Sequence, residues 1–380
     1  MKNLLKIIIY KCFYPFYYKH HTRKQIASKI ILLEPQQKKL SNVFFVLQKE
    51  LERDYNFDIK IHALKKESFF GAIKSDLCFL KDFATAKYLF TSDGCRVLAC
   101  VKKREGTVVT NLWHGCGAFK KFGFSTCDVK FGNDKDEMLK FPYYKNNDYA
   151  TVSSPEVVWA YKEAMNAEHF GIDVVATGVS RTDIFFDKDY IERAKNKLHD
   201  IFPQAKRKKV ILYAPTFRGE PSSAKAPTEL DVSSMAKELK DEYVLVTMHH
   251  PFVAELPKIS KDCSDFAADL SKHMLTDEMM CVCDICISDY SSLVFEYSLF
   301  QKPMVFFAYD IDEYNDWRGF FYPYDEFTPA PISKTTAELI TTIKQADFDK
   351  EKITAFREKF MYMCDGNATK RILDLVITKK

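Results

Sequence analysis

Residues 279–310, MMCVCDICISDYSSLVFEYSLFQKPMVFFAYD, alternate between apolar runs and polar turns in a way typical of α/β proteins. VCDICIS (282–288) alternates like a buried strand, another apolar strand is predicted after Pro303, and a serine pair followed by a short helix lies between them. A strand, a helix and a second strand in this order predict parallel strands joined by a helical crossover. KKVILYAPTFRGE (208–220) and SSMAKELKDEYVLVTMHHPF (233–252) precede this run, and they predict a strand with a polar loop, then a helix, a strand and a loop.

The first half of the chain shows the same alternation. We predict that its strands lie in NVFFVL (42–47), IKIHAL (59–64), AKYLFTS (86–92), VVTNLWHG (108–115) and YATVSS (149–154), and that VVATGVSRTDIFF (174–186) ends this half. The charged helical stretch 187–208 follows, so the junction between two domains is expected near residues 185–205. The resulting division is an N-terminal segment 1–40, a Rossmann-like domain 41–190 and a second Rossmann-like domain 191–380, each with a doubly wound parallel sheet.

Composition narrows the class of protein. The 380 residues are 47% hydrophobic and 28% charged with a formal net charge of +4, which excludes a disordered, collagen-like or polytopic membrane protein. A charge this small gives no basic field of the kind that nucleic-acid binding needs. The eleven cysteines are odd in number and scattered, so reduced thiols in a cytoplasm are expected. Cys281, Cys283 and Cys286 have the spacing of a metal site, but core packing is the favoured interpretation.

The N-terminal segment is basic and aromatic. It carries seven Lys or Arg residues before its first acid, Glu34, and its apolar run LLKIIIY is too short to span a bilayer. Such a segment can contact an anionic membrane surface, where each cation adds roughly 1 kcal/mol. The alternative is a helix that packs on the body of the protein and exposes its basic face to solvent.

Polar residues gather where the predicted strands end. In the second half, Asp289, Ser291 and Ser292 precede a short helix, where backbone N–H groups and hydroxyls suit a phosphate. Ordinary N-capping explains the same residues equally well. Glu296, one turn further on, either reaches a ribose or faces solvent.

Other strand ends offer a base and several cations. His114 precedes a glycine-containing loop with Lys120 and Lys121, and an imidazole can exchange a proton near neutral pH. A structural role is the alternative for this histidine. The remaining candidates are His250, Thr216 and Arg218 at strand ends, and Arg181 with Asp183 in the loop between the halves, where either phosphate binding or an interdomain ion pair would use the arginine.

An ordered series of motifs resembles the CDP-glycerol glycerophosphotransferase family, which includes teichoic acid primases and polymerases with a GT-B fold. The series covers roughly residues 80–335, and its members are WHG (113–115) with Lys120 and Lys121, TGVSRTD (177–183), ILYAPTFR (211–218), HP (250–251), ISDYSSLVFEY (287–297), KPMVFFAYDIDEY (302–314) and RGFFYPYDEFTPAPI (318–332).

The resemblance implies a GT-B enzyme whose two domains face a central cleft, with the acceptor in the first domain and the donor in the second. It would transfer glycerol phosphate from CDP-glycerol to a hydroxyl of a membrane-anchored glycan or polyol-phosphate acceptor and release CMP. His114 would take the acceptor proton, and His250 with Arg218 would stabilise the departing CMP. Further implied contacts are to the donor from Thr216, Asp289, Ser291, Ser292 and Glu296, and to phosphate or acceptor from Lys120, Lys121, Arg181 and Arg318.

No cofactor is expected to be required, since histidines, an arginine and helix N–H groups can stabilise the charge of phosphoryl transfer. Asp310 and Asp312 form a D-x-D sequence, but its place in the family stretch favours a structural role over Mg²⁺ binding. The expected location is the cytoplasm, at the inner face of the cell membrane. The alternatives are a transferase of the same fold that uses CDP-ribitol or a nucleotide sugar, and a catalytically silent membrane-associated scaffold.

Overall fold

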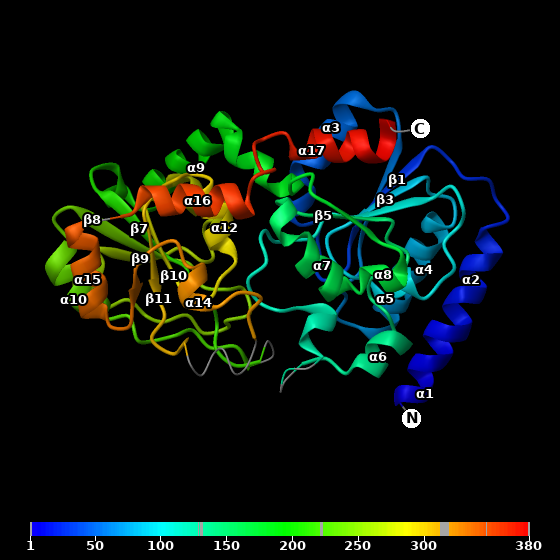
Figure 1. Ribbon diagram of the computed structural model, residues 1–380, viewed down its shortest axis with the longest axis horizontal. Coiled ribbons are helices and arrows are strands. Elements are labelled where there is room, and N and C mark those ends of the chain that lie inside the picture. Colours follow the sequence, from blue (N-terminus) through cyan, green and yellow to red (C-terminus); the bar gives the residue numbers. More distant parts are fainter. Residues whose placement is uncertain are drawn as a thin grey trace. The chain divides into compact units, whose positions relative to one another are not determined.

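The computed structural model describes residues 2–127, 129, 132–220, 223–311, 319–346 and 348–378. The chain forms two compact units, Met1–Asp183 with Tyr362–Lys380 and Ile184–Met361 (Figure 1). Each unit has a six-stranded sheet in which every strand pair is parallel, so the predicted α/β class with two Rossmann-like sheets is confirmed.

The sheet of the first unit has the order β2-β1-β3-β4-β5-β6. Its strands are β1 (Lys29–Glu34), β2 (Asp58–Ala63), β3 (Tyr88–Thr91), β4 (Val108–Asn111), β5 (Tyr149–Thr151) and β6 (Asp173–Val175). Its α-helices are α1 (Lys2–Ile7), α2 (Tyr14–His21), α3 (Phe45–Asp54), α4 (Phe69–Phe83), α5 (Arg96–Ala99), α6 (Lys135–Lys140), α7 (Val158–Met165), α8 (Ala167–Phe170) and α17 (Ala368–Leu373). The π-helical turn η1 (Ile8–Phe13) joins α1 to α2.

The sheet of the second unit has the order β12-β11-β10-β7-β8-β9. Its strands are β7 (Lys209–Tyr213), β8 (Tyr243–Thr247), β9 (Ala267–Asp269), β10 (Ile285–Ser288), β11 (Met304–Phe307) and β12 (Ile332–Ser333). The α-helices that the described residues form here are α9 (Lys188–Ile201), α10 (Val232–Leu239), α11 (Thr276–Val282), α12 (Leu293–Ser298), α14 (Tyr324–Phe327), α15 (Thr336–Gln345) and α16 (Lys350–Phe360).

Strand β1 is the centre of the first core, although it lies within the segment 1–40 that the sequence analysis set apart. Ile31 and Leu33 face a cluster that includes Tyr14 and Tyr18 of α2, while Ile30 and Leu32 face the opposite cluster. Successive side chains of a strand point to opposite faces, so β1 holds a layer of helices on each side. The segment 1–40 is therefore part of the first unit and not a separate element.

Two other expectations about this unit differ from the structure. Residues 42–47 are helical, because Val43, Phe44, Leu47 and Leu51 bury one helix face in the cluster beneath β1. The chain also returns to the first unit at its end, where Ile372 of α17 packs in the same cluster, beside α3 in Figure 1. The domain expected to run from 191 to 380 thus ends near residue 361 in this division.

The three clustered cysteines are core residues. Cys281 lies in the last turn of α11, Cys286 lies in β10, and all three are at most 5% exposed. The Lys302 ammonium donates to the carbonyls of Cys281 and Cys283 and so ties the end of α11 to β11.

Within the described residues, none of the helices combines the length and the apolar character that crossing a bilayer requires.

A buried carboxyl group fastens the N-terminal helix to the body. Tyr14 of α2 donates a hydrogen bond of 2.7 Å to Asp76 of α4. Burial raises the pKa of Asp76 to about 6, and the Tyr14 hydrogen bond opposes that rise in part. The ionised form of Asp76 is therefore disfavoured in the folded protein.

The raised pKa of Asp76 predicts that the stability of the protein depends on pH. Because the folded-state pKa lies above the unfolded value of about 3.9, the contribution of Asp76 is fully present below that value and is lost as pH rises through about 6. A rise of about two pKa units corresponds to about 3 kcal/mol. We expect the unfolding free energy of the parent, relative to Asp76→Asn, to fall by about that amount between pH 4 and pH 7 in urea titrations. Parallel pH curves for the two proteins would contradict this account of the helix anchor.

Candidate active site

The strand order of each sheet reverses once, and this reversal marks where ligands bind in open parallel sheets. In the first unit, the reversal lies between β1 and β3, and in the second between β7 and β10. Glu34 and Asp93 lie at the carboxyl ends of the first pair, and Thr216 and Asp289 lie just past those of the second. The sequence-predicted residues and their partners gather at these two edges.

His114 follows the carboxyl end of β4 and is about half exposed. Trp113 has a positive φ of 56°, and its backbone N–H donates to the Asn111 side chain at 2.9 Å, so the chain turns sharply before the histidine. The two rings stack with centroids 4.5 Å apart. This turn and the stacking fix the direction of the imidazole.

The Nδ1 atom of His114 lies beside two oxygens of the loop after β3. It is 3.3 Å from the Ser92 carbonyl and 3.7 Å from Oδ2 of Asp93. Such acceptors favour the tautomer with a proton on Nδ1, which leaves Nε2 as the nitrogen that can accept a proton. The arrangement is that of a general base oriented by a carboxylate.

Asp93 and Glu34 were missed by the sequence analysis. Burial raises the pKa of Asp93, the His114 imidazole and the Gly94 N–H oppose the rise, and Glu34 adds to it. Glu34 ends β1 and is 2% exposed. The signal that could have found Asp93 is the Thr-Ser-Asp-Gly sequence at the end of a strand (91–94), next in order to the strand that carries His114.

Arg181 and several hydrogen bonds hold the loop after His114. The Arg181 guanidinium donates to the His114 carbonyl at 2.7 Å. The Gly117 N–H donates to Ser153, and the Tyr161 hydroxyl donates to the Gly117 carbonyl. Arg181 thus contacts the backbone of the candidate base, which makes it a residue that positions the loop.

Lys120, Lys121 and Asp183, the other charged candidates of the first unit, lie in different environments. Lys120 and Lys121 lie on the loop after Gly117 and are partly exposed. Asp183 accepts the N–H groups of Ala368 and Thr369 at the start of α17, so this carboxylate caps a helix of its own unit.

Asp289 is the centre of the second edge. It is 1% exposed, and its carboxylate accepts the backbone N–H of Thr216 at 2.8 Å and an N–H of Arg218 at 3.0 Å. Its carbonyl accepts the hydroxyl of Tyr324. Asp289 therefore joins the loops that follow β7 and β10.

Arg218 forms a two-point ion pair with Asp310. Its Nε and Nη2 atoms donate to the two carboxylate oxygens at 2.6 and 2.9 Å, and the Tyr290 hydroxyl donates to the same carboxylate. Burial alone would lower the pKa of Arg218, but the hydrogen bonds with Asp310 and the charge of Asp289 raise it overall. In this structure the guanidinium thus links two carboxylates of one unit.

The predicted phosphate residues lie at the start of α12. Ser291 accepts the N–H of Leu293 at 3.3 Å, which is a local turn contact, and Ser292 is exposed with no side-chain capping bond to the helix. Glu296 is 2% exposed, so the interpretation in which it faces solvent is wrong.

The two adjacent histidines after β8 have opposite environments. His250 is exposed, and its Nδ1 atom accepts the N–H of Phe252 at 3.1 Å, so Nε2 carries the proton of the neutral ring. His249 is buried 3.5 Å from Asp269; burial lowers the pKa of His249, and the carboxylate opposes this. Only the exposed histidine is placed to meet a ligand without a change of structure.

Two predicted positions, Arg318 and Asp312, lie outside the described residues. Among the residues that the structure describes, no three His, Cys, Asp or Glu side chains are grouped as metal ligands would be. That no cofactor is required stays a prediction.

Two parallel six-stranded sheets flanked by helices are the architecture of GT-B transferases. The chain belongs to the CDP-glycerol:poly(glycerophosphate) glycerophosphotransferase family, whose model matches residues 16–378. The family predicted from the motif series is thereby confirmed.

Curated relatives include both ribitol-phosphate and glycerol-phosphate enzymes. The chain is 38% identical to a teichoic acid poly(ribitol-phosphate) polymerase of Bacillus spizizenii over 88% of its own length, yet spans only 54% of that polymerase. It is 33% identical to the teichoic acid ribitol-phosphate primase of the same organism, covering 92% of this chain and 90% of the primase. It is 32% identical to the teichoic acid glycerol-phosphate primase of Bacillus subtilis, with 77% and 73% covered.

A solved structure shows the same fold. The wall teichoic acid polymerase TagF superposes with a TM-score of 0.76 over 98% of this chain and 95% of that chain, at 22% identity.

Proposed function

We propose that this chain is a CDP-polyol-dependent transferase that moves a polyol phosphate onto a hydroxyl of a membrane-anchored glycan or polyol-phosphate acceptor, at the inner face of the membrane. The observation that carries the proposal is the oriented His114–Asp93 pair at the ligand-binding edge of the first sheet, in a chain of this family. The product would belong to teichoic acid or a related wall polymer, since the curated relatives carry teichoic acid names.

The proposed step is a displacement at phosphorus. Nε2 of His114 takes the proton of the acceptor hydroxyl while that oxygen attacks the phosphorus that bears the polyol. The bond from this phosphorus to the bridging oxygen breaks, and CMP leaves with the electron pair of that bond. Phosphoryl transfer needs little covalent chemistry from the protein. Hydrogen-bond donors that point at the developing negative charge therefore contribute most of the acceleration.

The second unit would hold the donor. His250 is exposed at a strand end, the Thr216 N–H contacts the buried carboxylate of Asp289, and Ser291 and Ser292 follow Asp289 at the start of α12. Because Arg218 is already joined to Asp289 and Asp310, we assign it to positioning these loops, with charge stabilisation as a second effect.

The polyol of the donor has two candidates. The motif series favours CDP-glycerol, and the family description names that donor. Four curated relatives that are 33–38% identical to this chain are named for ribitol phosphate, which favours CDP-ribitol. Both donors present the same cytidine and diphosphate, so one site can be tested with either.

Calorimetric titration with CDP-glycerol, CDP-ribitol, CMP and UDP-glucose tests the donor class. The proposal expects the cytidine ligands to bind and UDP-glucose to bind much more weakly, with tighter binding of one CDP-polyol naming the polyol. Absence of cytidine binding, or preference for UDP-glucose, would overturn the proposal and favour a scaffold or a sugar transferase.

The serine pair gives a prediction for donor binding. Replacing both Ser291 and Ser292 by Ala should weaken CMP binding by about 10²–10⁴-fold, because each hydrogen bond to the charged phosphate contributes about 1.5–3 kcal/mol. Calorimetry with CMP measures the effect, and the pair Ser233→Ala with Ser234→Ala at the start of α10 serves as the matched control. Unchanged affinity would reassign Ser291 and Ser292 to shaping the turn.

A further inference from the structure

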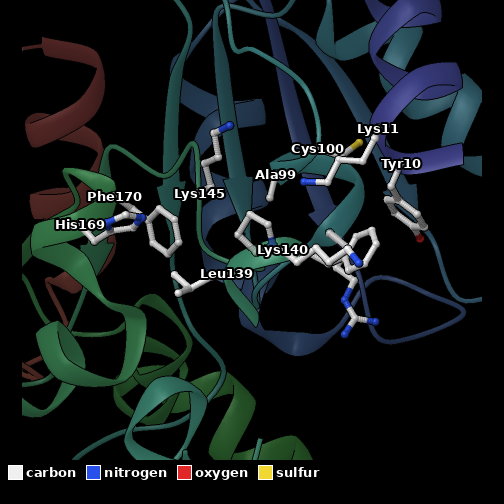
Figure 2. A pocket seen from close by; sticks show the side chains of 12 residues that line it. Tyr10, Lys11, Ala99, Cys100, Leu139, Lys140, Lys145, His169 and Phe170 are labelled. Carbon is white, nitrogen blue, oxygen red and sulfur yellow. The ribbon is translucent and has the colours of Figure 1, made fainter. Parts of the chain in front are cut away.

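A cationic pocket lies in the first unit beside the N-terminal helix. Its volume is about 350 Å³, within the range of small-ligand pockets. Figure 2 shows Tyr10 and Lys11 of η1 on one side, His169 and Phe170 of α8 on the other, and Lys140 between them. The transferase proposal uses none of these residues.

Four permanent cations line this pocket: Lys11, Arg96, Lys140 and Lys145. The lining contains no Asp or Glu. Within the described part of the chain, none of the four has an ion-pair partner, and the buried Nε atom of Arg96 has no hydrogen-bond acceptor. Four unpaired cations around one cavity repel each other, and an anion in the cavity would remove that repulsion.

An acid that acts on two of these cations is already paired. Glu137 of α6 forms an ion pair with Lys6 of α1, and this contact is the main reason that the pKa of Glu137 is lowered. The Lys6 ammonium also lies 4.0 Å from the centre of the Phe141 ring, which forms part of the pocket wall. Arg96 and Lys140 add a weaker electrostatic effect on Glu137, but its ion pair is with Lys6 and not with any of the four pocket cations.

Exposed apolar side chains lie on the helices that carry this wall. Leu4, Leu5 and Ile8 are 48–62% exposed, and Phe16 is 75% exposed. Apolar side chains next to a group of cations form the pattern of a surface that lies in the headgroup region of a membrane. A soluble phosphate would use the cations alone, whereas a lipid would use both features.

We propose that this pocket binds the phosphate headgroup of an anionic membrane lipid, and that the exposed side chains of α1, η1 and α2 enter the adjoining acyl boundary. The cations complement the charge of the phosphate, and the volume admits one headgroup. The basic N-terminal segment would thus hold the protein at the membrane through a defined site as well as through its general charge.

Vesicle flotation tests the proposal with the full chain. The probe vesicles contain four parts phosphatidylcholine to one part phosphatidic acid. Lys11→Gln with Lys140→Gln removes two exposed pocket cations without opening the core, and we expect about 25-fold weaker binding, since each cation near an anionic surface contributes about fivefold. The matched control is Lys195→Gln with Lys237→Gln in the second unit, which removes the same charge and should leave binding within about twofold.

A second measurement identifies the source of the phosphate. Dihexanoyl phosphatidic acid and inorganic phosphate are each titrated calorimetrically into the parent protein. The proposal expects the lipid to bind at one site, at least about tenfold more tightly than inorganic phosphate, and to lose affinity in the pocket variant. In calorimetry, equal affinity for both ligands would contradict the assignment of a lipid to this pocket. In flotation, a pocket variant that binds vesicles as the parent does would show that the pocket is not the binding site. No turnover is measured, so failure here is separate from failure of the transferase proposal.

Discussion

His114→Ala is expected to lower kcat for polyol-phosphate transfer by about 10²–10⁴-fold, the usual contribution of a general base. Donor affinity should stay within about twofold, because the imidazole is proposed to act on the acceptor hydroxyl and not on the cytidine diphosphate. The measurement is CMP release under saturating donor and acceptor, paired with calorimetry for CMP.

The control for this variant is His273→Ala, which removes another exposed histidine that has no assigned role. It should leave kcat unchanged. A His114→Ala enzyme as fast as the parent would remove this residue from the mechanism, and a loss of CMP affinity with normal kcat would move it to the donor site.

Arg218→Met is expected to destabilise the second unit by about 3–5 kcal/mol, because breaking a buried ion pair by removing one partner leaves the other charge uncompensated. The Asp289 side chain is 2% exposed and that of Asp310 is 19% exposed, so water cannot replace the guanidinium around Asp289. Urea unfolding followed by circular dichroism measures the change. Hydrogen exchange of the β7 and β10 amides assigns it to this unit.

The double variant Arg218→Met with Asp289→Asn tests whether the loss of stability comes from the uncompensated charge of Asp289. Removing this uncompensated charge should recover part of the lost stability. The control is Lys209→Met, which removes an exposed lysine and should change the stability little. If Arg218→Met kept the parent's stability while CMP affinity fell, the arginine would be a direct ligand of the donor and the positioning role would be wrong.

Buried parallel strands were the part of the fold most readily predicted from the sequence. The runs at 209–213, 243–247, 285–288 and 304–307 are continuous and apolar because both faces of a parallel sheet are covered by helices. Residues 42–47 are equally apolar, but their buried side chains recur with a helical period that continues to Leu51. A short apolar run alone does not separate these cases.

Strand β1 and the return of the chain to the first unit were missed for a different reason. Basic and aromatic residues surround 29–34, so local composition indicated a surface segment, whereas pairing with β2 and β3 places this strand inside the sheet. The packing of Ile372 against the layer beneath β1 depends on a contact between the two ends of the chain, which no local pattern reports.

The site was predicted in part. His114 and Asp289 were found because polar residues after apolar strands stand out in the sequence. Asp93 and Glu34 were not, since the approach of Asp93 to His114, and of Glu34 to Asp93, depends on the strand order β1-β3-β4. Likewise, the ion pair of Arg218 joins residues 92 positions apart, so its positioning role became visible only in the structure.

Transfer of the polyol phosphate is tested directly by incubating the protein with CDP-glycerol or CDP-ribitol and a lipid-linked glycan acceptor, and measuring the nucleotide released together with the acceptor mass. We expect one CMP for each polyol phosphate added to the acceptor, with one of the two donors preferred and with His114→Ala inactive in the same assay. Release of CDP with transfer of the bare polyol, or an acceptor of unchanged mass with both donors, would contradict this expectation.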